Sequence, residues 1–196
     1  MGKTGVFGVL CLQGGYANHV AMLRTLGHEA REVRYPEELD GLRGIVLPGG
    51  ESTTIGMLLE RHGLFAPLRD AILGGLPAFG TCAGAIMLAS EILGSDQPRF
   101  GAIDLTVDRN AYGSQVDSFE AKIEFRVPAA GIDAVVDGVF IRAPKFTRVG
   151  KEVETFAEYG GQPVLVRGKN VLACSFHPEL TADTTIHRFF CEMALS

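Results

Sequence analysis

Residues 78–85, A-F-G-T-C-A-G-A, place one cysteine, Cys82, between two glycines directly after a short apolar run. This G-x-C-x-G pattern has the form of a nucleophile elbow with cysteine in place of serine. In such an elbow a sharp strand-to-helix turn exposes the side chain, and small flanking residues let the neighbouring backbone pass close by. The start of a helix also favours the thiolate, which is the form that attacks carbonyl carbons. Taken alone, the pattern fits a buried cysteine beside helix-packing glycines equally well.

A cysteine nucleophile needs a base, and the base needs a group that orients it. The stretch C-S-F-H-P-E-L at 174–180 supplies His177 and Glu179 just after a predicted strand. Pro178 favours an extended conformation at His177, and extended residues at i and i+2 point to the same side. Glu179 is then placed to accept a hydrogen bond from one imidazole nitrogen while the other nitrogen faces Cys82. We therefore predict a Cys-His-Glu catalytic triad.

The other histidines have no comparable setting. They lie on predicted helices or turns, and we expect them to be ordinary structural residues: His19, His28, His62 and His187.

The stretch L-P-G-G-E-S-T at 47–53 contains a double glycine directly after another predicted strand. The backbone N–H of Gly50 and that of Ala83, next to the nucleophile, could together form an oxyanion hole. Glu51 and Ser52 could bind the polar ends of a substrate. A second interpretation is a tight turn in which Ser52 or the following threonine caps the next helix, and the two interpretations are compatible.

Strand-like and helix-like segments alternate along the first half of the chain. Strands are predicted at 6–12, 29–33, 44–47 and 76–79, and helices at 16–26, 53–61, 65–73 and 83–91. The second half is richer in strands, at 103–108, 121–125, 135–141, 153–159, 164–166 and 171–175, before a C-terminal helix at 184–194. This alternation predicts an α/β fold of three layers, with a mainly parallel sheet and helices on both faces, in a single domain over residues 1–196.

Several polar or glycine-containing loops directly follow the predicted strands. Gln13, Gly49-Gly50 and Cys82 each occupy such a position. In parallel sheets, ligands bind beyond the carboxyl ends of the strands. We therefore expect these three loops to meet at one edge of the sheet.

Composition excludes several classes of function. The 196 residues are 46% hydrophobic and 21% charged, with a net charge of −5 and no basic run, which argues against nucleic acid or anionic membrane as partner. The four cysteines form no C-x-x-C pair, which argues against a zinc ribbon or a redox motif, and no cluster of ligands suggests a metal or cofactor. The chain is long enough to bury a core without disulfides, so we expect a reducing, cytoplasmic compartment. We expect the apolar run near the N-terminus to be the first strand, not a signal peptide, and no stretch is long enough to span a membrane.

Taken in order, G-T-C-A-G, L-P-G-G-E-S-T and S-F-H-P-E resemble a class I, triad-type glutamine amidotransferase, whose fold is flavodoxin-like. Three further segments restrict this resemblance to one family of amidotransferases: G-V-L-C-L-Q-G near the N-terminus, R-N-A-Y-G at 109–113 and F-I-R-A-P at 140–144. Over essentially its whole length, the chain is similar to the glutaminase subunits of pyridoxal 5′-phosphate synthase (the PdxT/SNO family).

This resemblance implies hydrolysis of L-glutamine to L-glutamate and ammonia. The ammonia would pass to a separate synthase subunit, which builds the vitamin B6 cofactor from a pentose phosphate, a triose phosphate and that ammonia. The synthase would form a dodecameric core decorated by glutaminase subunits. Such subunits are poorly active alone, and we expect the Gly49-Gly50 peptide to act as a gate that turns its N–H inward on docking.

The family's functional positions map onto this chain one by one. Cys82, His177 and Glu179 match the triad; the positions that match the glutamine-binding residues are Gly50, Glu51, Ser52, Arg109, Ile141 and Arg142. Gln13 matches a glutamine near the active site and the subunit interface. The two arginines would clamp the α-carboxylate of the substrate. The chain departs from the pattern at Ser114, where many members of the family carry arginine.

Three alternatives remain open from the sequence. The same fold and triad could serve a γ-glutamyl hydrolase or cysteine peptidase, or a glutaminase subunit of histidine or purine synthesis. The third alternative is a non-catalytic binding or redox-sensing protein on this scaffold. Glutamine analogues would not label Cys82 in such a protein.

Overall fold

Short apolar runs form the centre of the sheet. β3 (Gly44–Leu47), β4 (Ala78–Thr81) and β12 (Val171–Cys174) are buried along their whole length, as expected of strands that are covered on both faces. In the computed structural model, which describes residues 4–109 and 118–196, they belong to a mostly parallel sheet of order β10-β11-β12-β4-β3-β1-β2. β11 runs antiparallel to both of its neighbours.

The other strands are β1 (Val6–Leu10), β2 (Glu29–Val33), β5 (Ala89–Ile92), β6 (Ile103–Asp108), β7 (Ser118–Val127), β8 (Ile132–Ile141), β9 (Lys145–Val149), β10 (Glu154–Tyr159) and β11 (Gln162–Gly168). The α-helices are α1 (Tyr16–Thr25), α2 (Ser52–Arg61), α3 (Phe65–Leu73), α4 (Ala83–Leu88) and α5 (Thr185–Leu195). Short 3₁₀ turns occupy Pro36–Leu39, Pro128–Ala130 and Pro178–Leu180.

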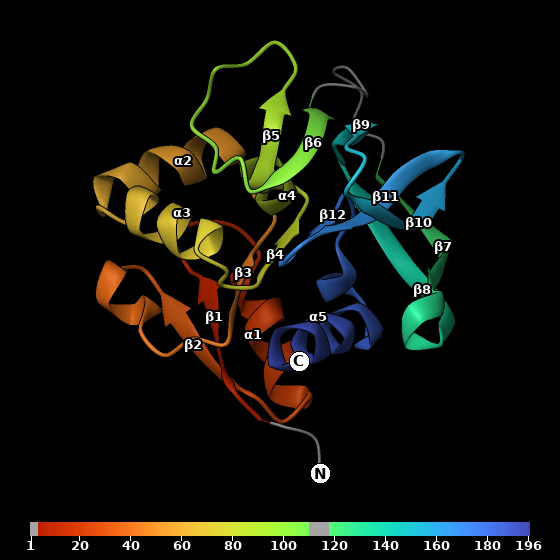
Figure 1. Cartoon of the computed structure of the whole chain (residues 1–196), viewed down its shortest axis with the longest axis horizontal. Helices are drawn as coiled ribbons and strands as arrows, with labels where there is room; N and C mark the ends of the chain where they lie inside the picture. Colours follow the sequence, from red (N-terminus) through yellow and green to blue (C-terminus); the bar gives the residue numbers. More distant parts are fainter. Residues whose placement is uncertain (1–3, 110–117) are drawn as a thin grey trace.

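Helices cover both faces of the sheet (Figure 1). α1 and α5 pack on one face, where Leu23 and Phe190 join a core cluster with β1, β4 and β12. α2, α3 and α4 pack on the other face, where Leu59 and Leu68 join a second cluster. The fold class predicted from the sequence, a mainly parallel sheet between two helical layers, is therefore confirmed. Within the described residues, no helix is both long and apolar enough to cross a membrane.

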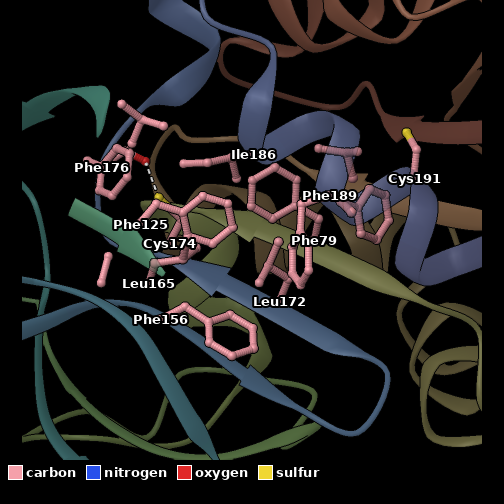
Figure 2. Packing of buried hydrophobic residues seen from close by; sticks show 14 of the residues in the cluster. Phe79, Phe125, Phe156, Leu165, Leu172, Cys174, Phe176, Ile186, Phe189 and Cys191 are labelled. Atoms are coloured by element: carbon pink, nitrogen blue, oxygen red, sulfur yellow. Dashed lines mark hydrogen bonds between the residues drawn. The ribbon is translucent and has the colours of Figure 1, made fainter. Parts of the chain in front are cut away.

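Aromatic side chains anchor the segment that follows β12. Figure 2 shows Phe176 and Cys174 in the core with Phe125 of β7, and the Cys174 thiol donates a hydrogen bond to the Phe176 carbonyl at 3.3 Å. Phe176 is fully buried. The next residue, His177, donates its backbone N–H to the Val139 carbonyl of β8 at 2.8 Å. Both contacts fix the direction in which the chain leaves the sheet.

The bounds of most elements agree with the sequence predictions within two or three residues, but one prediction is wrong and one strand has no counterpart among the predictions. The helix predicted over 83–91 ends at Leu88, and Ala89–Ile92 form β5 beside β6. The strand Lys145–Val149 was not predicted; it pairs with β6, and its polar exposed face hides the apolar pattern. These strands, β5, β6 and β9, form a small separate sheet among the described residues, and β7 and β8 form a hairpin.

The turn from β4 into α4 is as sharp as the glycine pattern predicts. Cys82 has φ +49° and ψ −105°, a conformation that L-residues rarely adopt and that costs about 1–3 kcal/mol. A Cβ atom on Gly84 would lie 2.0 Å from the Leu47 carbonyl oxygen, and one on Gly80 would lie 2.5 Å from the Gly84 backbone. The two glycines therefore let α4 approach β3 and β4 closely.

We expect G84A to lower the free energy of unfolding by about 1–3 kcal/mol, because the added methyl group forces α4 away from the β3 backbone. Chemical denaturation of both proteins measures this change. The matched control is G56A in α2, where the nearest atoms to an added Cβ are 3.8 Å away and alanine should stabilise the helix by about 0.5–1 kcal/mol. Equal stability of the G84A protein and the wild type would contradict this account of the turn.

Candidate active site

Cys82 lies at the carboxyl end of β4, between the sheet and the β8 hairpin. Its backbone N–H donates to the Cys174 carbonyl at 2.8 Å, which ties the turn to β12. Its Sγ lies 3.9 Å from the Ile141 carbonyl oxygen. The side chain is thus held against the end of β8, where the sequence places Ile141 and Arg142.

The other three cysteines are poor candidates for a nucleophile. Burial raises the pKa of Cys11 to about 11 and that of Cys191 to about 12. Burial also raises the pKa of Cys174 well above its ordinary value. These thiols stay protonated at neutral pH, and only the thiolate attacks carbonyl carbons. Cys82 is therefore the best candidate of the four.

His177 and Glu179 form a buried pair directly after β12. The Glu179 Oε1 atom lies 2.7 Å from His177 Nδ1, and the two residues are 4% and 9% exposed, respectively. The hydrogen bond expected from the H-P-E spacing is therefore confirmed. Cys82 lies next to this ring, because a Cβ atom on Gly49 would lie 2.3 Å from His177 Cε1 and 3.4 Å from Cys82 Cβ.

This environment controls the charge on His177. Burial lowers the pKa of the imidazole, but the hydrogen bonds with Cys82 and Glu179 outweigh burial and raise the pKa to about 10. For Glu179, burial raises the pKa, but His19 and His177 outweigh it and hold the pKa far below its usual range. The resting pair is therefore an imidazolium beside a carboxylate, and the ring holds a proton that it can give to a leaving group.

The loop after β1 contacts the loop after β3, as the sequence predicts. The Gly15 N–H donates to the Gly49 carbonyl at 3.1 Å, and the Glu51 N–H donates to Gln13 Oε1 at 2.8 Å. A Cβ atom on Gly49 would lie 2.3 Å from His177 Cε1, and one on Gly50 would lie 2.3 Å from Gln13 Oε1. The double glycine is required because His177 and Gln13 occupy the space on either side.

The start of α2 is capped differently from the sequence expectation. Glu51, not Ser52 or Thr53, is the N-cap, and its carboxylate accepts from the Thr53 N–H at 3.3 Å and the Thr53 hydroxyl at 2.9 Å. Ser52 does not cap the helix, and its hydroxyl donates a hydrogen bond to Gln97 Oε1 at 3.3 Å. The same oxygen of Gln97 accepts from the Arg109 guanidinium. Gln97 thus joins two of the predicted glutamine-binding residues.

Arg142 is exposed and follows Ile141 at the end of β8. Its φ of +45° is a strained conformation for a residue with a side chain, and such strain gathers at functional sites. The stretch 109–113 is described only at Arg109, and Ser114 also lies outside the described residues.

Sequence reasoning missed the residues behind the site. Gln97 lies in an irregular loop with no motif around it. His19 and His187, expected to be ordinary structural residues, are fully buried and lie next to each other, with His19 Nδ1 2.9 Å from His187 Nε2. Because 168 residues separate the two histidines, no local spacing could indicate this contact.

The comparisons with known proteins agree with this geometry. The profile of the SNO glutamine amidotransferase family matches residues 9–196. A pyridoxal 5′-phosphate synthase subunit PdxT of Thermus thermophilus is 53% identical over 192 residues, which cover 97% of this chain and 98% of that protein. The protein of the same name from Corynebacterium jeikeium is 51% identical and covers 96% of each.

A solved structure described as a glutamine amidotransferase has the same fold. It superposes with a TM-score of 0.90 and is 51% identical, and the match covers 98% of this chain and 100% of that one.

We expect E179Q to lower the pKa of His177 from its raised value, because the substitution removes the negative charge that favours the imidazolium. Titration of the ¹⁵N-labelled imidazole by NMR measures this pKa in the isolated chain. E51Q is the matched control, because the Glu51 carboxylate contacts Thr53 instead. An identical His177 titration in the wild type and E179Q would show that the Glu179 charge does not act on the ring.

Proposed function

Because the chain belongs to the SNO glutamine amidotransferase family, we propose that it is the glutaminase subunit of a pyridoxal 5′-phosphate synthase. It hydrolyses L-glutamine to L-glutamate and ammonia, and it delivers the ammonia to the synthase subunit for vitamin B6 synthesis. The observation that carries this function is the buried His177–Glu179 pair beside Cys82 at a strained strand-to-helix turn. The relatives named above favour this synthase over histidine or purine synthesis and over γ-glutamyl hydrolysis.

The reaction begins with attack of the Cys82 thiolate on the side-chain amide carbon of glutamine. His177 gives its proton to the departing nitrogen, so that ammonia leaves and a glutamyl thioester remains on Cys82. His177, now neutral, takes a proton from water as the water attacks the thioester. Glutamate leaves, and the thiolate–imidazolium pair is restored. Glu179 keeps the ring oriented in both steps.

The oxyanion of each tetrahedral intermediate is held by the backbone N–H groups of Gly50 and Ala83. The Gly49 carbonyl accepts a hydrogen bond from the Gly15 N–H. The Gly50 N–H belongs to the same trans peptide and therefore points in the direction opposite to that carbonyl. We propose that docking on the synthase turns the Gly49-Gly50 peptide, which breaks this hydrogen bond and aims the Gly50 N–H at the substrate. Gln13, which borders the same loop, lies at this interface.

Substrate binding is assigned to the polar groups around the triad. Gly50, Glu51 and Ser52 contact the substrate from the start of α2, and Arg109 clamps the α-carboxylate through its guanidinium. Gln97 supports this assignment, because it holds the Ser52 hydroxyl and Arg109 together. The Ile141-Arg142 segment closes the other side, where the Ile141 carbonyl faces Cys82.

We further propose that residues 1–196 act as one glutaminase domain in the cytoplasm, decorating a dodecameric synthase core. All four cysteines lie in the described part of the chain and are free and buried, which is typical of a reducing compartment. The mass of the mixed complex in solution tests the assembly, and a complex too small for twelve synthase subunits would contradict it.

The function predicts glutamate release from L-glutamine when the chain is mixed with its synthase subunit, and little release from the chain alone. C82A should lower kcat in the mixture by about 10³-fold or more, because no other group can form the thioester.

R109L should raise KM, because it removes a charge-assisted contact to the substrate. A coupled glutamate dehydrogenase assay measures all three proteins.

The matched control for R109L is R126L, because Arg126 lies on β7 and pairs with Glu124 and Asp133 in solvent. Its KM should equal that of the wild type. No release in the mixture would contradict the function, and full release from the isolated chain would contradict the gate at Gly49-Gly50.

A further inference from the structure

Two histidines that the reaction does not use lie directly behind the triad. His19 of α1 and His187 of α5 are both 0% exposed, and both rings pack against Phe79 of β4. Burial of an imidazole in an apolar core is costly unless its nitrogens form hydrogen bonds. The partners of these nitrogens therefore indicate what the pair does.

The His19 ring contacts the triad at Glu179. Its Nε2 atom lies 3.5 Å from Glu179 Oε1 and 3.2 Å from the Thr81 hydroxyl, and Thr81 immediately precedes Cys82. Glu179 Oε1 therefore lies between two imidazole rings, those of His19 and His177. Glu179 Oε2 has no hydrogen-bond partner among the described residues. The carboxylate is thus held through one oxygen by two histidines.

The proton positions follow from the charge on Glu179. His19 and His177 keep this carboxyl ionised, so the His19 Nε2 atom that faces it must carry a hydrogen. The Nδ1 atom of His19 faces His187 Nε2 at 2.9 Å. Burial lowers the pKa of His187 to about 3, so this ring is neutral and can either donate to or accept from Nδ1. His187 therefore supports a donor at His19 Nε2 whether His19 is neutral or protonated.

We propose that His19 is a positioning residue of the glutaminase reaction, whose buried imidazole holds the Glu179 carboxylate against His177 while His187 fixes the His19 ring. This inference rests on the proposed function. His19 acts through Glu179 and has no role in substrate contact. Loss of its N–H should therefore lower kcat and leave KM for glutamine unchanged.

The test compares two substitutions of His19 in the complex with the synthase subunit. H19L removes the donor and should lower kcat by about 10- to 100-fold, the loss expected for a hydrogen bond to a charged group. H19Q places an amide nitrogen near the position of the imidazole Nε2, so it should recover most of that loss. If kcat for H19L equals the wild-type value, or if H19Q is no better than H19L, the proposal is wrong.

The matched structural control is V20A on the same helix. Val20 is 6% exposed and apolar, so its truncation weakens the core without removing a hydrogen bond to the triad. V20A should lower the melting temperature and keep kcat. An equal loss of kcat in V20A and H19L would assign the effect of H19L to stability and overturn the proposal.

The wild-type chain gives an independent test if H19L does not fold. In ¹⁵N-histidine spectra, the hydrogen-bonded Nε2–H of His19 should give a downfield proton signal that moves in E179Q and is missing in H19Q. A signal that is unchanged in E179Q would show that His19 does not donate to Glu179. Absence of glutamate release from the wild-type complex would contradict the proposed function, whereas an active complex that is insensitive to His19 would contradict only this inference.

Discussion

The 2.7 Å hydrogen bond between His177 and Glu179 is the interaction on which the site depends. Neither group would be ionised if buried alone, because desolvation disfavours both charges. Together they form a charged pair whose imidazolium faces Cys82. The position of His177 is fixed by the preceding residue, Phe176, which is buried in the core, and by the hydrogen bond from the His177 backbone N–H to the Val139 carbonyl. The chemistry that we propose for Cys82 therefore depends on how the chain leaves β12.

Close approach of backbones is the second constraint. Gly84 lets α4 lie against Leu47, and Gly49 leaves room for the His177 ring. Each glycine lies where an added Cβ atom would clash with another part of the site. The glycines of G-T-C-A-G and P-G-G are therefore needed for backbone packing as well as for the proposed catalysis. This explains why the strained conformation of Cys82 is tolerated: the contacts around the turn, including the hydrogen bond from its N–H to the Cys174 carbonyl, determine that conformation.

Features that depend on neighbouring residues could be predicted from the sequence. The sheet strands, the turn at Cys82 and the His177–Glu179 pair follow from apolar runs, flanking glycines and i, i+2 spacing. The bond between His19 and His187 could not be predicted, because it joins helices from opposite ends of the chain. Strand β5 was mistaken for helix because its apolar residues continue the helical pattern of α4, and its pairing with β6 decides its structure.

Covalent labelling by 6-diazo-5-oxo-L-norleucine, a glutamine analogue, in the complex with the synthase subunit tests most directly whether Cys82 is the nucleophile. Peptide mass spectrometry after digestion locates the label. We expect modification at Cys82 alone, because the other cysteines are buried thiols with raised pKa values. Labelling of another cysteine, or an active complex in which Cys82 stays unmodified, would contradict it.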